Sequence, residues 1–530
     1  MVNLFKAAWL LASSLHIPGL TFDHEISSEP QVSKTIAVIG AGSAGIAALK
    51  ALMDLPSSIA QNWNITLYEQ RGDVAGVWLP DPRPVSPPSI PYTPLYPLLR
   101  TNTPVPFMTY PGFPFPPGTP LYPSHEHLKA YHSSYASHNN LTPHIKFHHT
   151  VIKTEWVGDS EKGFWDITLL DDRNRTLRAG AEHLIVASGN NHLPRIPTWK
   201  GQEEWVEAGA GQRELFHSIY YREADHYTNR TLLVIGVGAS GQDAAVQTVK
   251  LTRKTYVSVR HEVDLPTGSD DVVVQGEVSH FTREGVHFVD GTVLTDVDSV
   301  LLATGYEQRK PFLEAGGVLT YDPSAHSNAS SSSRGGALVT NTNYIFPLHQ
   351  HILSLSPQYP VNALSFIGLP TRIANCPSDY AQSLFAVQAI AKPWILPSRA
   401  KLLEELADRE EDTRRAGLDP YVIGHAMLPD RATSNDYQDD IVDFLKQKVR
   451  AAIPDDGHKY VEEWRRNVFN YDYLKRGWKH LEALGVADDW VRDVKTERQW
   501  TDLMYRVNAW QESWEKENNI PFIDDTFASY

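Results

Sequence analysis

Two short glycine-rich segments carry the clearest chemical signal in the sequence. Both have the G-x-G-x-x-G spacing, with glycines at Gly40, Gly42, Gly45, Gly236, Gly238 and Gly241. Each follows an apolar run and precedes a helix-forming stretch, which predicts a buried strand, a tight turn and a helix. There the backbone can approach a pyrophosphate, and the helix points free N–H groups and its positive dipole end at the phosphates. The sequence therefore predicts two dinucleotide sites, against the alternative of two ordinary strand–helix turns.

The residues that end the second strand of each unit distinguish the two sites. In the first unit the run NITLY leads to Glu69, and a carboxylate there hydrogen-bonds an unphosphorylated ribose, as in FAD. In the second unit the run KTYVSVR carries Ser258 and Arg260. A guanidinium beside a hydroxyl suits the 2′-phosphate of NADPH, whereas the alternative for Arg260 is a solvated surface charge. We therefore expect a flavoprotein oxidoreductase that holds both FAD and NADPH.

The elements that must position these residues divide the chain around the two turns. Residues 1–30 are expected to form an N-terminal extension, 31–205 and 308–530 a discontinuous FAD-binding domain, and 206–307 an NADPH-binding domain. The expected fold class is α/β, with two Rossmann-like dinucleotide-binding domains and a helical C-terminal extension. Residues 79–123 are dense in proline, which predicts a long loop of functional importance.

Composition limits the kinds of partner and site. The 530 residues include 48 basic and 63 acidic side chains, and the net charge of −15 argues against a nucleic-acid partner. The single cysteine, Cys376, excludes an intramolecular disulfide, a C-x-x-C redox pair and a cysteine-rich metal site. His125, His127 and His132 lack the H-E-x-x-H spacing, so no metal site is expected.

The two ends of the chain bear on its location. Residues 1–20 have one lysine before a short apolar core, which resembles a weak signal peptide. We favour a simple extension and a soluble, cytoplasmic protein, with entry to the secretory pathway as the alternative. No apolar run reaches the ~18–20 residues of a spanning helix, and the final FIDDTFASY is too short and acidic for a membrane anchor. The oligomeric state stays open, with a homodimer as one alternative.

Further motifs between about residues 34 and 390 act together. They are GAGSAG, E…AGVW, LRTNTPVPFMTYPGFPFP, YPSHEHLKAY, HSIYYR, GVGASGQDA, LLATGY and IFPLHQHI…LSFIGLP. In combination they resemble the flavin-containing monooxygenase family, in the class that also holds Baeyer–Villiger and N-hydroxylating monooxygenases. The resemblance implies an FAD- and NADPH-dependent monooxygenase that uses O2 and a C4a-hydroperoxyflavin to oxygenate a nitrogen or sulfur atom of a small molecule.

The resemblance also implies roles for particular residues. The expected FAD contacts are Gly40, Gly42, Ser43, Gly45, Glu69, Arg71, Gly76, Val77, Trp78 and Asn102. The expected NADPH contacts and strand ends are Gly236, Gly238, Ser240, Gly241, Ser258, Arg260, Thr304 and Gly305. Asn102 is the catalytic candidate beside the flavin, since an amide donates and accepts without titrating; the alternative is a turn asparagine in a proline-rich loop. The family hinge signature is matched by His217, Ser218, Tyr221 and Arg222.

Some positions depart from the family pattern and leave alternatives. Gly211 and Arg213 stand where the hinge signature usually has Phe and Gly, Ala239 where Asn is usual, and Ala75 where Gly is common. These departures bear on coenzyme geometry. The Tyr221–Arg222 pair favours heteroatom oxygenation over the Baeyer–Villiger pattern of Trp followed by Pro or Asp. The alternatives are a Baeyer–Villiger enzyme acting on a ketone and a non-catalytic flavin- and NADPH-binding protein.

Overall fold

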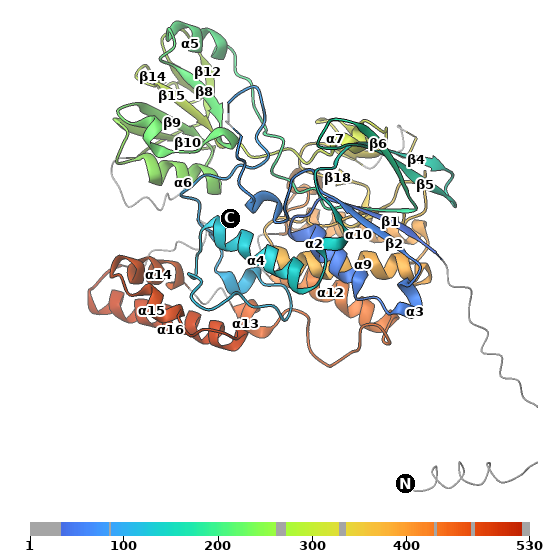
Figure 1. The fold of residues 1–530 in the computed structure, drawn as a ribbon. Helices are drawn as coiled ribbons and strands as arrows, with labels where there is room; N and C mark the ends of the chain where they lie inside the picture. Colours follow the sequence, from blue (N-terminus) through green and yellow to red (C-terminus); the bar gives the residue numbers. More distant parts are fainter. Residues whose placement is uncertain are drawn as a thin grey trace, which may run out of the picture.

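One mixed and one parallel sheet form the frame of the protein, in two units that stand side by side (Figure 1). The computed structural model describes residues 33–83, 86–260, 272–327, 335–428, 432–467 and 472–521. The extension expected at 1–30 and the final FIDDTFASY lie outside these ranges. The architecture confirms the α/β class with two Rossmann-type units and a helical C-terminal region.

The first sheet has the order β19-β20-β21-β7-β1-β2-β3. Its strands are β1 (Thr35–Ile39), β2 (Asn64–Tyr68), β3 (Ile145–Lys146), β7 (His183–Val186), β19 (Leu348–His349), β20 (Leu353–Ser354) and β21 (Leu364–Phe366). The central strand β1 runs parallel to β2 and β7, with Val38 opposite Leu67 and Ile185. It reads as a continuous apolar run because both faces of the sheet are covered.

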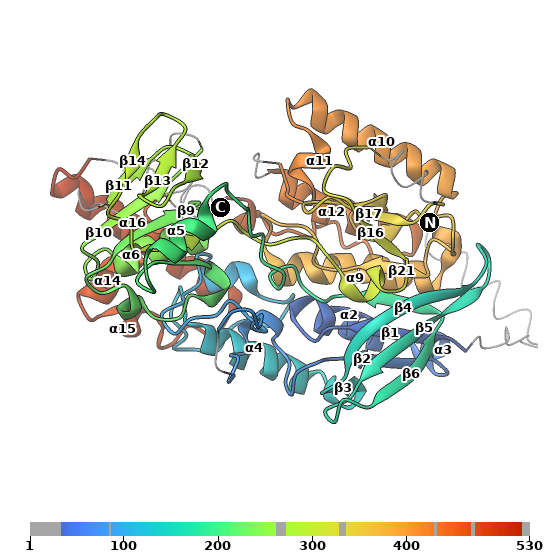
Figure 2. The same ribbon diagram turned by 90° about the horizontal axis from the view of Figure 1, so that it is seen from above.

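Alternate residues of β1 belong to two different cores. Ile36 and Val38 pack with the helices α2 (Ser43–Met53) and α9 (Asn375–Ala391). Ala37 and Ile39 pack with a three-stranded antiparallel sheet of β4 (Thr150–Gly158), β5 (Gly163–Leu170) and β6 (Thr176–Ala181). Figure 2 shows this antiparallel sheet of β4, β5 and β6 lying beside β1 and β2, on the side away from α9. The side-chain alternation of a strand therefore joins the two layers.

The second sheet has the order β11-β10-β9-β15-β8, and its neighbouring strands run parallel. Its strands are β8 (Glu214–His217), β9 (Thr231–Ile235), β10 (Lys254–Ser258), β11 (Val272–Gln275) and β15 (Ser299–Leu302). Helix α6 (Ala239–Thr248) covers one face. The other face packs with α5 (Gln202–Ala208) and the strands β12 (Val278–Phe281), β13 (Val286–Phe288) and β14 (Val293–Leu294). Thus α5, which spans the expected domain boundary at 205/206, packs with the second unit.

Two adjacent linkers join the units. The outgoing linker follows β7, and the returning linker follows β15. Pro194 and Tyr306 pair in an antiparallel bridge, and Arg195 N donates to Gly305 O at 2.9 Å. Lys310 in the returning linker donates from Nζ to Gly189 O at 2.7 Å. The second unit is therefore an insertion whose two ends meet near the carboxyl end of β7 in the first sheet.

The proline-rich segment 79–123 is a loop, as predicted. It follows the 3-10 turn η1 (Gly76–Trp78) and contains a single 3-10 turn, η2 (Val105–Met108), among its described residues. It leads into α4 (His125–His138). Contacts with the rest of the protein fix the loop in place, for example the 2.6 Å hydrogen bond from Arg465 Nη1 to Pro106 O.

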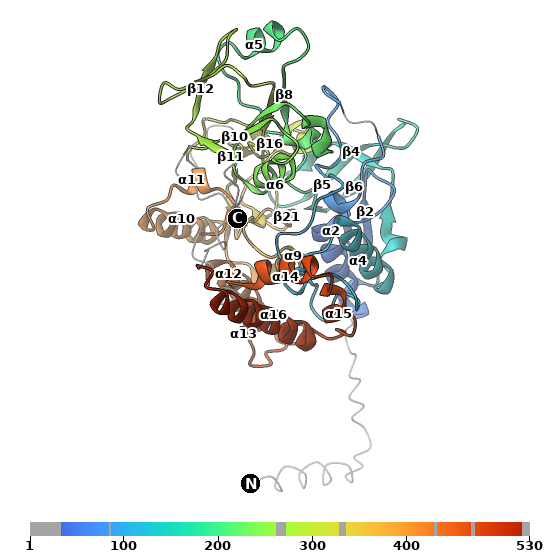
Figure 3. The same cartoon turned by 90° about the vertical axis from the view of Figure 1, so that its left-hand side faces the viewer.

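The C-terminal part is helical, as expected. Its longer helices are α10 (Arg399–Arg415), α12 (Ala432–Lys448), α14 (Leu474–Ala483) and α16 (Glu497–Glu517), with the short α11 (Pro420–Ile423), α13 (Glu463–Arg466) and α15 (Ala487–Val491) between them. Figure 3 shows α14 and α16 side by side. Within the part of the chain that the structure describes, no helix combines the length and the apolar composition that a bilayer crossing requires.

The remaining elements are short and connect these layers. They are α3 (Ser57–Ala60), η3 (Thr142–His144), η4 (Ser218–Tyr220), η5 (Ala224–Tyr227), α7 (Pro311–Glu314), β16 (Leu319–Tyr321), β17 (Leu338–Thr340), β18 (Ile345–Phe346) and η6 (Pro393–Ile395). None of them carries a residue of the expected glycine turns.

Candidate cofactor and active site

The first glycine turn joins β1 to α2, and its three glycines serve different purposes. Gly40 has φ +98°, and a Cβ there would lie 2.6 Å from Ala187 O. A Cβ on Gly45 would lie 1.7 Å from Gly40 O, so close packing of helix and strand requires glycine. Gly42 has φ −75°, and its Cβ would make only an ordinary 3.5 Å contact with Gly76 Cα. The fold itself therefore does not require glycine at 42.

The second glycine turn, between β9 and α6, repeats this pattern. Gly236 has φ +101° and Gly241 packs against Gly236 O, so both positions exclude a side chain. Gly238 has φ −66°, and its Cβ would meet no atom within 4 Å. Neither α2 nor α6 has a side-chain cap at its first turn. Each turn thus leaves an open middle position beside backbone N–H groups, as a bound pyrophosphate needs.

Glu69 and Arg71 organise the first site from the end of β2. Glu69 is only 6% exposed and accepts hydrogen bonds from Ala41 N at 2.7 Å and Arg71 N at 2.8 Å. Burial raises its pKa, although these hydrogen bonds oppose the shift. The Arg71 guanidinium donates to the carbonyls of Gly76 and Leu79 at 3.2 and 2.7 Å. The carboxylate therefore lies where a ribose is expected, next to the glycine turn.

The segment Gly76–Trp78 forms a second wall of this site. Gly76 has φ +50°, and a Cβ there would lie 2.8 Å from Gly42 Cα, so the two glycines meet backbone to backbone. Ala75, with φ +86°, donates from N to Ala41 O at 3.0 Å. Val77 O accepts from Thr93 Oγ1, and Trp78 packs against the main core. The structure thus brings together most of the expected FAD contacts.

The expected 2′-phosphate contacts behave differently from each other. Ser258 is buried, and its hydroxyl donates to Gly276 O at 2.8 Å, so it is engaged within the unit. The Arg260 side chain is 76% exposed, and its Nε lies 3.3 Å from Glu277 Oε1. Of these two residues, Arg260 is therefore the one whose side chain faces outward. The sequence analysis missed Glu277, because a carboxylate in the short connection between β11 and β12 has no motif.

Asn102 lies in a turn that is fixed on both sides. Thr101 N donates to Pro123 O, and Val105 N donates to Leu121 O, each at 3.0 Å. Asn102 is exposed, and its Oδ1 lies 3.4 Å from Thr103 Oγ1, which donates to it. The amide therefore occupies an exposed position on a backbone that is held on both sides.

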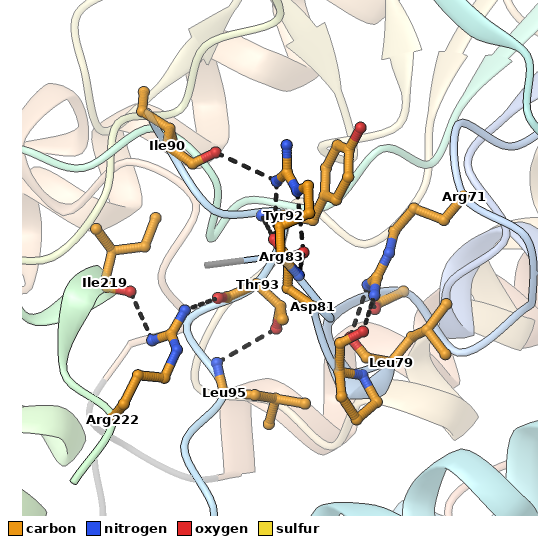
Figure 4. Close-up of polar contacts among 12 residues, drawn as sticks. Arg71, Leu79, Asp81, Arg83, Ile90, Tyr92, Thr93, Leu95, Ile219 and Arg222 are labelled. Carbon is orange, nitrogen blue, oxygen red and sulfur yellow. Dashed lines mark hydrogen bonds and ion pairs between the residues drawn. The ribbon is translucent and has the colours of Figure 1, made fainter. Parts of the chain in front are cut away.

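A polar cluster in the proline-rich loop was missed by the sequence analysis (Figure 4). The Asp81 carboxylate accepts from Arg83 Nε at 3.0 Å and from Tyr92 N at 2.7 Å. Burial alone would raise the pKa of Asp81, but these hydrogen bonds hold it well below its usual range. Arg83 also lies over the Tyr92 ring, 3.7 Å from its centre. This cluster joins residues 81–92 at the start of the loop. The spacing of these residues in the sequence matches no motif that would have predicted it.

The linkers contain the expected strand-end residues and one unexpected cation. Thr304 Oγ1 donates to Arg195 O, and Gly305 O lies 2.9 Å from His217 Nε2. Lys310 is only 2% exposed and also donates to Asn190 Oδ1 at 3.1 Å. Burial lowers its pKa to about 7. A buried lysine with neutral acceptors marks this edge of the first sheet as electrostatically unusual.

The two glycine turns lie on two sheets joined by paired linkers, and each has the strand–turn–helix arrangement of a Rossmann dinucleotide site. A family model described as Flavin-binding monooxygenase-like matches residues 33–264. The chain is 28% identical over 402 residues to senecionine N-oxygenase of Tyria jacobaeae, covering 73% of this chain and 78% of that one. It is also 28% identical over 367 residues to thiol-specific monooxygenase of Saccharomyces cerevisiae, covering 68% and 77%.

The fold has relatives among solved structures. S-allyl-L-cysteine S-oxygenase from Allium sativum superposes with a TM-score of 0.66 at 21% identity, covering 90% of this chain and 99% of that chain. The family model and the two relatives confirm the resemblance drawn from the motifs and the expectation of a flavin-dependent monooxygenase.

Proposed function

We propose that the protein oxygenates a nitrogen or sulfur atom of a small molecule, using FAD, NADPH and O2. The observation that carries the proposal is the repeated glycine turn, in which Gly42 and Gly238 are dispensable to the fold. Two such openings in one chain support two different dinucleotides. The names of the N-oxygenase and thiol-specific relatives support a heteroatom as the oxygen acceptor.

The residues present fit both groups. FAD would be held by the first glycine turn, Glu69 and the wall at 76–78, and NADPH by the second turn with Arg260 at its 2′-phosphate. Bound FAD would supply the redox chemistry, with NADPH as the reductant and O2 as the oxidant. The balanced reaction consumes NADPH, a proton and O2, adds one oxygen atom to the substrate heteroatom, and releases NADP⁺ and water. The proline-rich loop would keep bulk water from the reacting atoms.

A cavity of about 140 Å³ lies beside the returning linker. It opens between the returning linker and the segment after β21 and is lined by Tyr306, Gln308, Thr342, Asn343, Thr371, Val422, Ile423, His425 and Ala426. Gln308 Oε1 is buried and has no hydrogen-bond partner among the described residues.

The function is tested by giving the purified protein NADPH, O2 and a panel of small amines, sulfides and ketones. We expect a yellow protein that NADPH bleaches faster than NADH does, because Arg260 has no 2′-phosphate to meet in NADH. Mass spectrometry should find an N- or S-oxide. Formation of esters from ketones, without oxidation of any amine or sulfide, would contradict the proposal. The proposal would also be contradicted if no substrate of the panel caused NADPH consumption.

Asn102→Ala is expected to divert electrons from substrate to hydrogen peroxide. The amide would hold the activated oxygen by a hydrogen bond without supplying a proton at any working pH. Losing one such bond, worth about 1.4 kcal/mol, corresponds to roughly tenfold faster peroxide release. The measurement is hydrogen peroxide formed per NADPH consumed, with Asn102→Asp as a variant of the same size. Unchanged peroxide release in Asn102→Ala would remove Asn102 from the mechanism.

A further inference from the structure

One stretch of the proline-rich loop packs within the second unit. We call residues 93–100 the strap. Tyr96 is 6% exposed and lies in one hydrophobic cluster with Tyr221, Leu232 and Val257 of the second unit. Leu99 packs against the same cluster. Although the strap follows the FAD wall in sequence, its apolar side chains therefore belong to the NADPH-binding unit.

Two polar contacts fix the strap to that unit. The Tyr96 hydroxyl donates to Asp243 Oδ2 on α6. Arg222 donates to Thr93 O at 3.1 Å and to Ile219 O at 2.8 Å (Figure 4). It also donates to Tyr221 O at 2.7 Å. The Tyr96 ring meets the Tyr221 ring edge-on, with centroids 5.1 Å apart. The contacts are buried or half-buried, which strengthens them relative to surface pairs.

One end of the strap reaches the expected FAD wall, and the other end lies next to Asn102. Thr93 Oγ1 donates to Val77 O, in the segment expected to line FAD. At the far end lies Arg100, two residues before Asn102. Its Nη1 pairs with Glu482 on α14 at 2.8 Å. The strap therefore runs from the wall of one cofactor site, across the unit of the other, to the catalytic candidate.

Asp243 connects the strap to the second glycine turn. It lies five residues after Gly238, in the helix that starts at that turn. Burial raises its pKa, while Lys475 and Lys479 on the neighbouring α14 oppose the shift. Because a helix moves as a rigid element, any change at the turn that displaces α6 displaces the acceptor of the Tyr96 hydroxyl.

We propose that the strap couples occupancy of the second dinucleotide site to the placement of Asn102, with Tyr96 and Arg222 as positioning residues. The inference rests on the proposed function for the identity of the dinucleotide. Binding of NADPH or NADP⁺ would steady α6, the strap and the Asn102 turn together. Loss of the Tyr96 hydroxyl would leave both cofactor sites intact and uncouple them.

The test compares Tyr96→Phe with Tyr227→Phe. Tyr227 lies in the same cluster, and among the described residues its hydroxyl makes no hydrogen bond to the strap. Hydrogen exchange is measured on the FAD-loaded enzyme with and without NADP⁺. In the natural protein and in Tyr227→Phe, NADP⁺ should slow exchange of amides 93–104 by about tenfold, a factor that one hydrogen bond can supply. In Tyr96→Phe this protection should vanish, while residues 236–248 stay protected.

A second readout and variant keep the proposal falsifiable. Peroxide release per NADPH should rise in Tyr96→Phe without a change in NADPH affinity, whereas Tyr227→Phe should match the natural protein. Asp243→Asn, which keeps an acceptor oxygen, should behave as the natural protein, and Asp243→Ala as Tyr96→Phe. Retained protection of 93–104 in Tyr96→Phe would overturn the proposal. Absence of NADP⁺ protection at 236–248 in the natural protein would instead count against the proposed function.

Discussion

Gly42→Val is expected to give a folded protein that no longer holds flavin. The backbone at 42 accepts any residue, since φ is −75° and a Cβ would make an ordinary contact. The side chain would fill the space that a pyrophosphate needs at the start of α2. Overpacking of about 3 kcal/mol corresponds to a loss of roughly 100-fold in FAD affinity. The flavin-to-protein absorbance ratio of the purified variant measures this directly.

Circular dichroism and thermal melting separate this effect from unfolding. We expect the spectrum of Gly42→Val to match that of the natural protein after its FAD has been removed. Gly45→Ala provides the contrasting case, because its Cβ would lie 1.7 Å from Gly40 O and should disturb the fold itself. A Gly42→Val protein that is purified with a full complement of FAD would show that the first turn does not bind the pyrophosphate.

Gly238→Val is expected to keep its flavin and lose its response to NADPH. At this position the added Cβ meets no protein atom within 4 Å, so the fold has no reason to change. A valine beside the first turn of α6 would exclude the coenzyme phosphates, with an expected loss of roughly 100-fold in NADPH affinity. Stopped-flow bleaching of the flavin against NADPH concentration gives the dissociation constant, and dithionite should still reduce the flavin.

The two glycine variants serve as controls for each other. Each removes one dinucleotide and should spare the other, because the turns belong to different sheets. If Gly238→Val also lost FAD, the two sites would depend on one another. If it were bleached by NADPH as fast as the natural protein, the second turn would have another purpose.

Residue patterns predicted the parts of the site that depend on backbone geometry. The two glycine turns, the strands before them and Glu69 follow from local rules, because a strand, a turn and a helix leave a signature within about 30 residues. The long loop at 79–123 was predicted equally well, since proline excludes regular structure. These are properties that neighbouring residues determine among themselves.

Contacts between distant residues could not be predicted in this way. Asp81 and Tyr92, Tyr96 and Asp243, and Lys310 and Gly189 each meet only because the whole chain has folded. A single tyrosine, aspartate or lysine has many more common roles on a surface. The opposing charge of Glu277 near Arg260 belongs to the same category, because Glu277 lies in the short connection between β11 and β12.

The paired linkers have a consequence for how such a protein can change over time. Because the second unit leaves and returns through one antiparallel contact, at Pro194 and Tyr306, its removal would not cut any strand of its host. The unit could therefore be exchanged as one segment, provided that the incoming unit also fits the strap at 93–100, whose Tyr96 packs in this unit. Under the proposed function, chimaeras that exchange the segment between these two junctions, at Pro194 and Tyr306, should keep their flavin and change the coenzyme that reduces it.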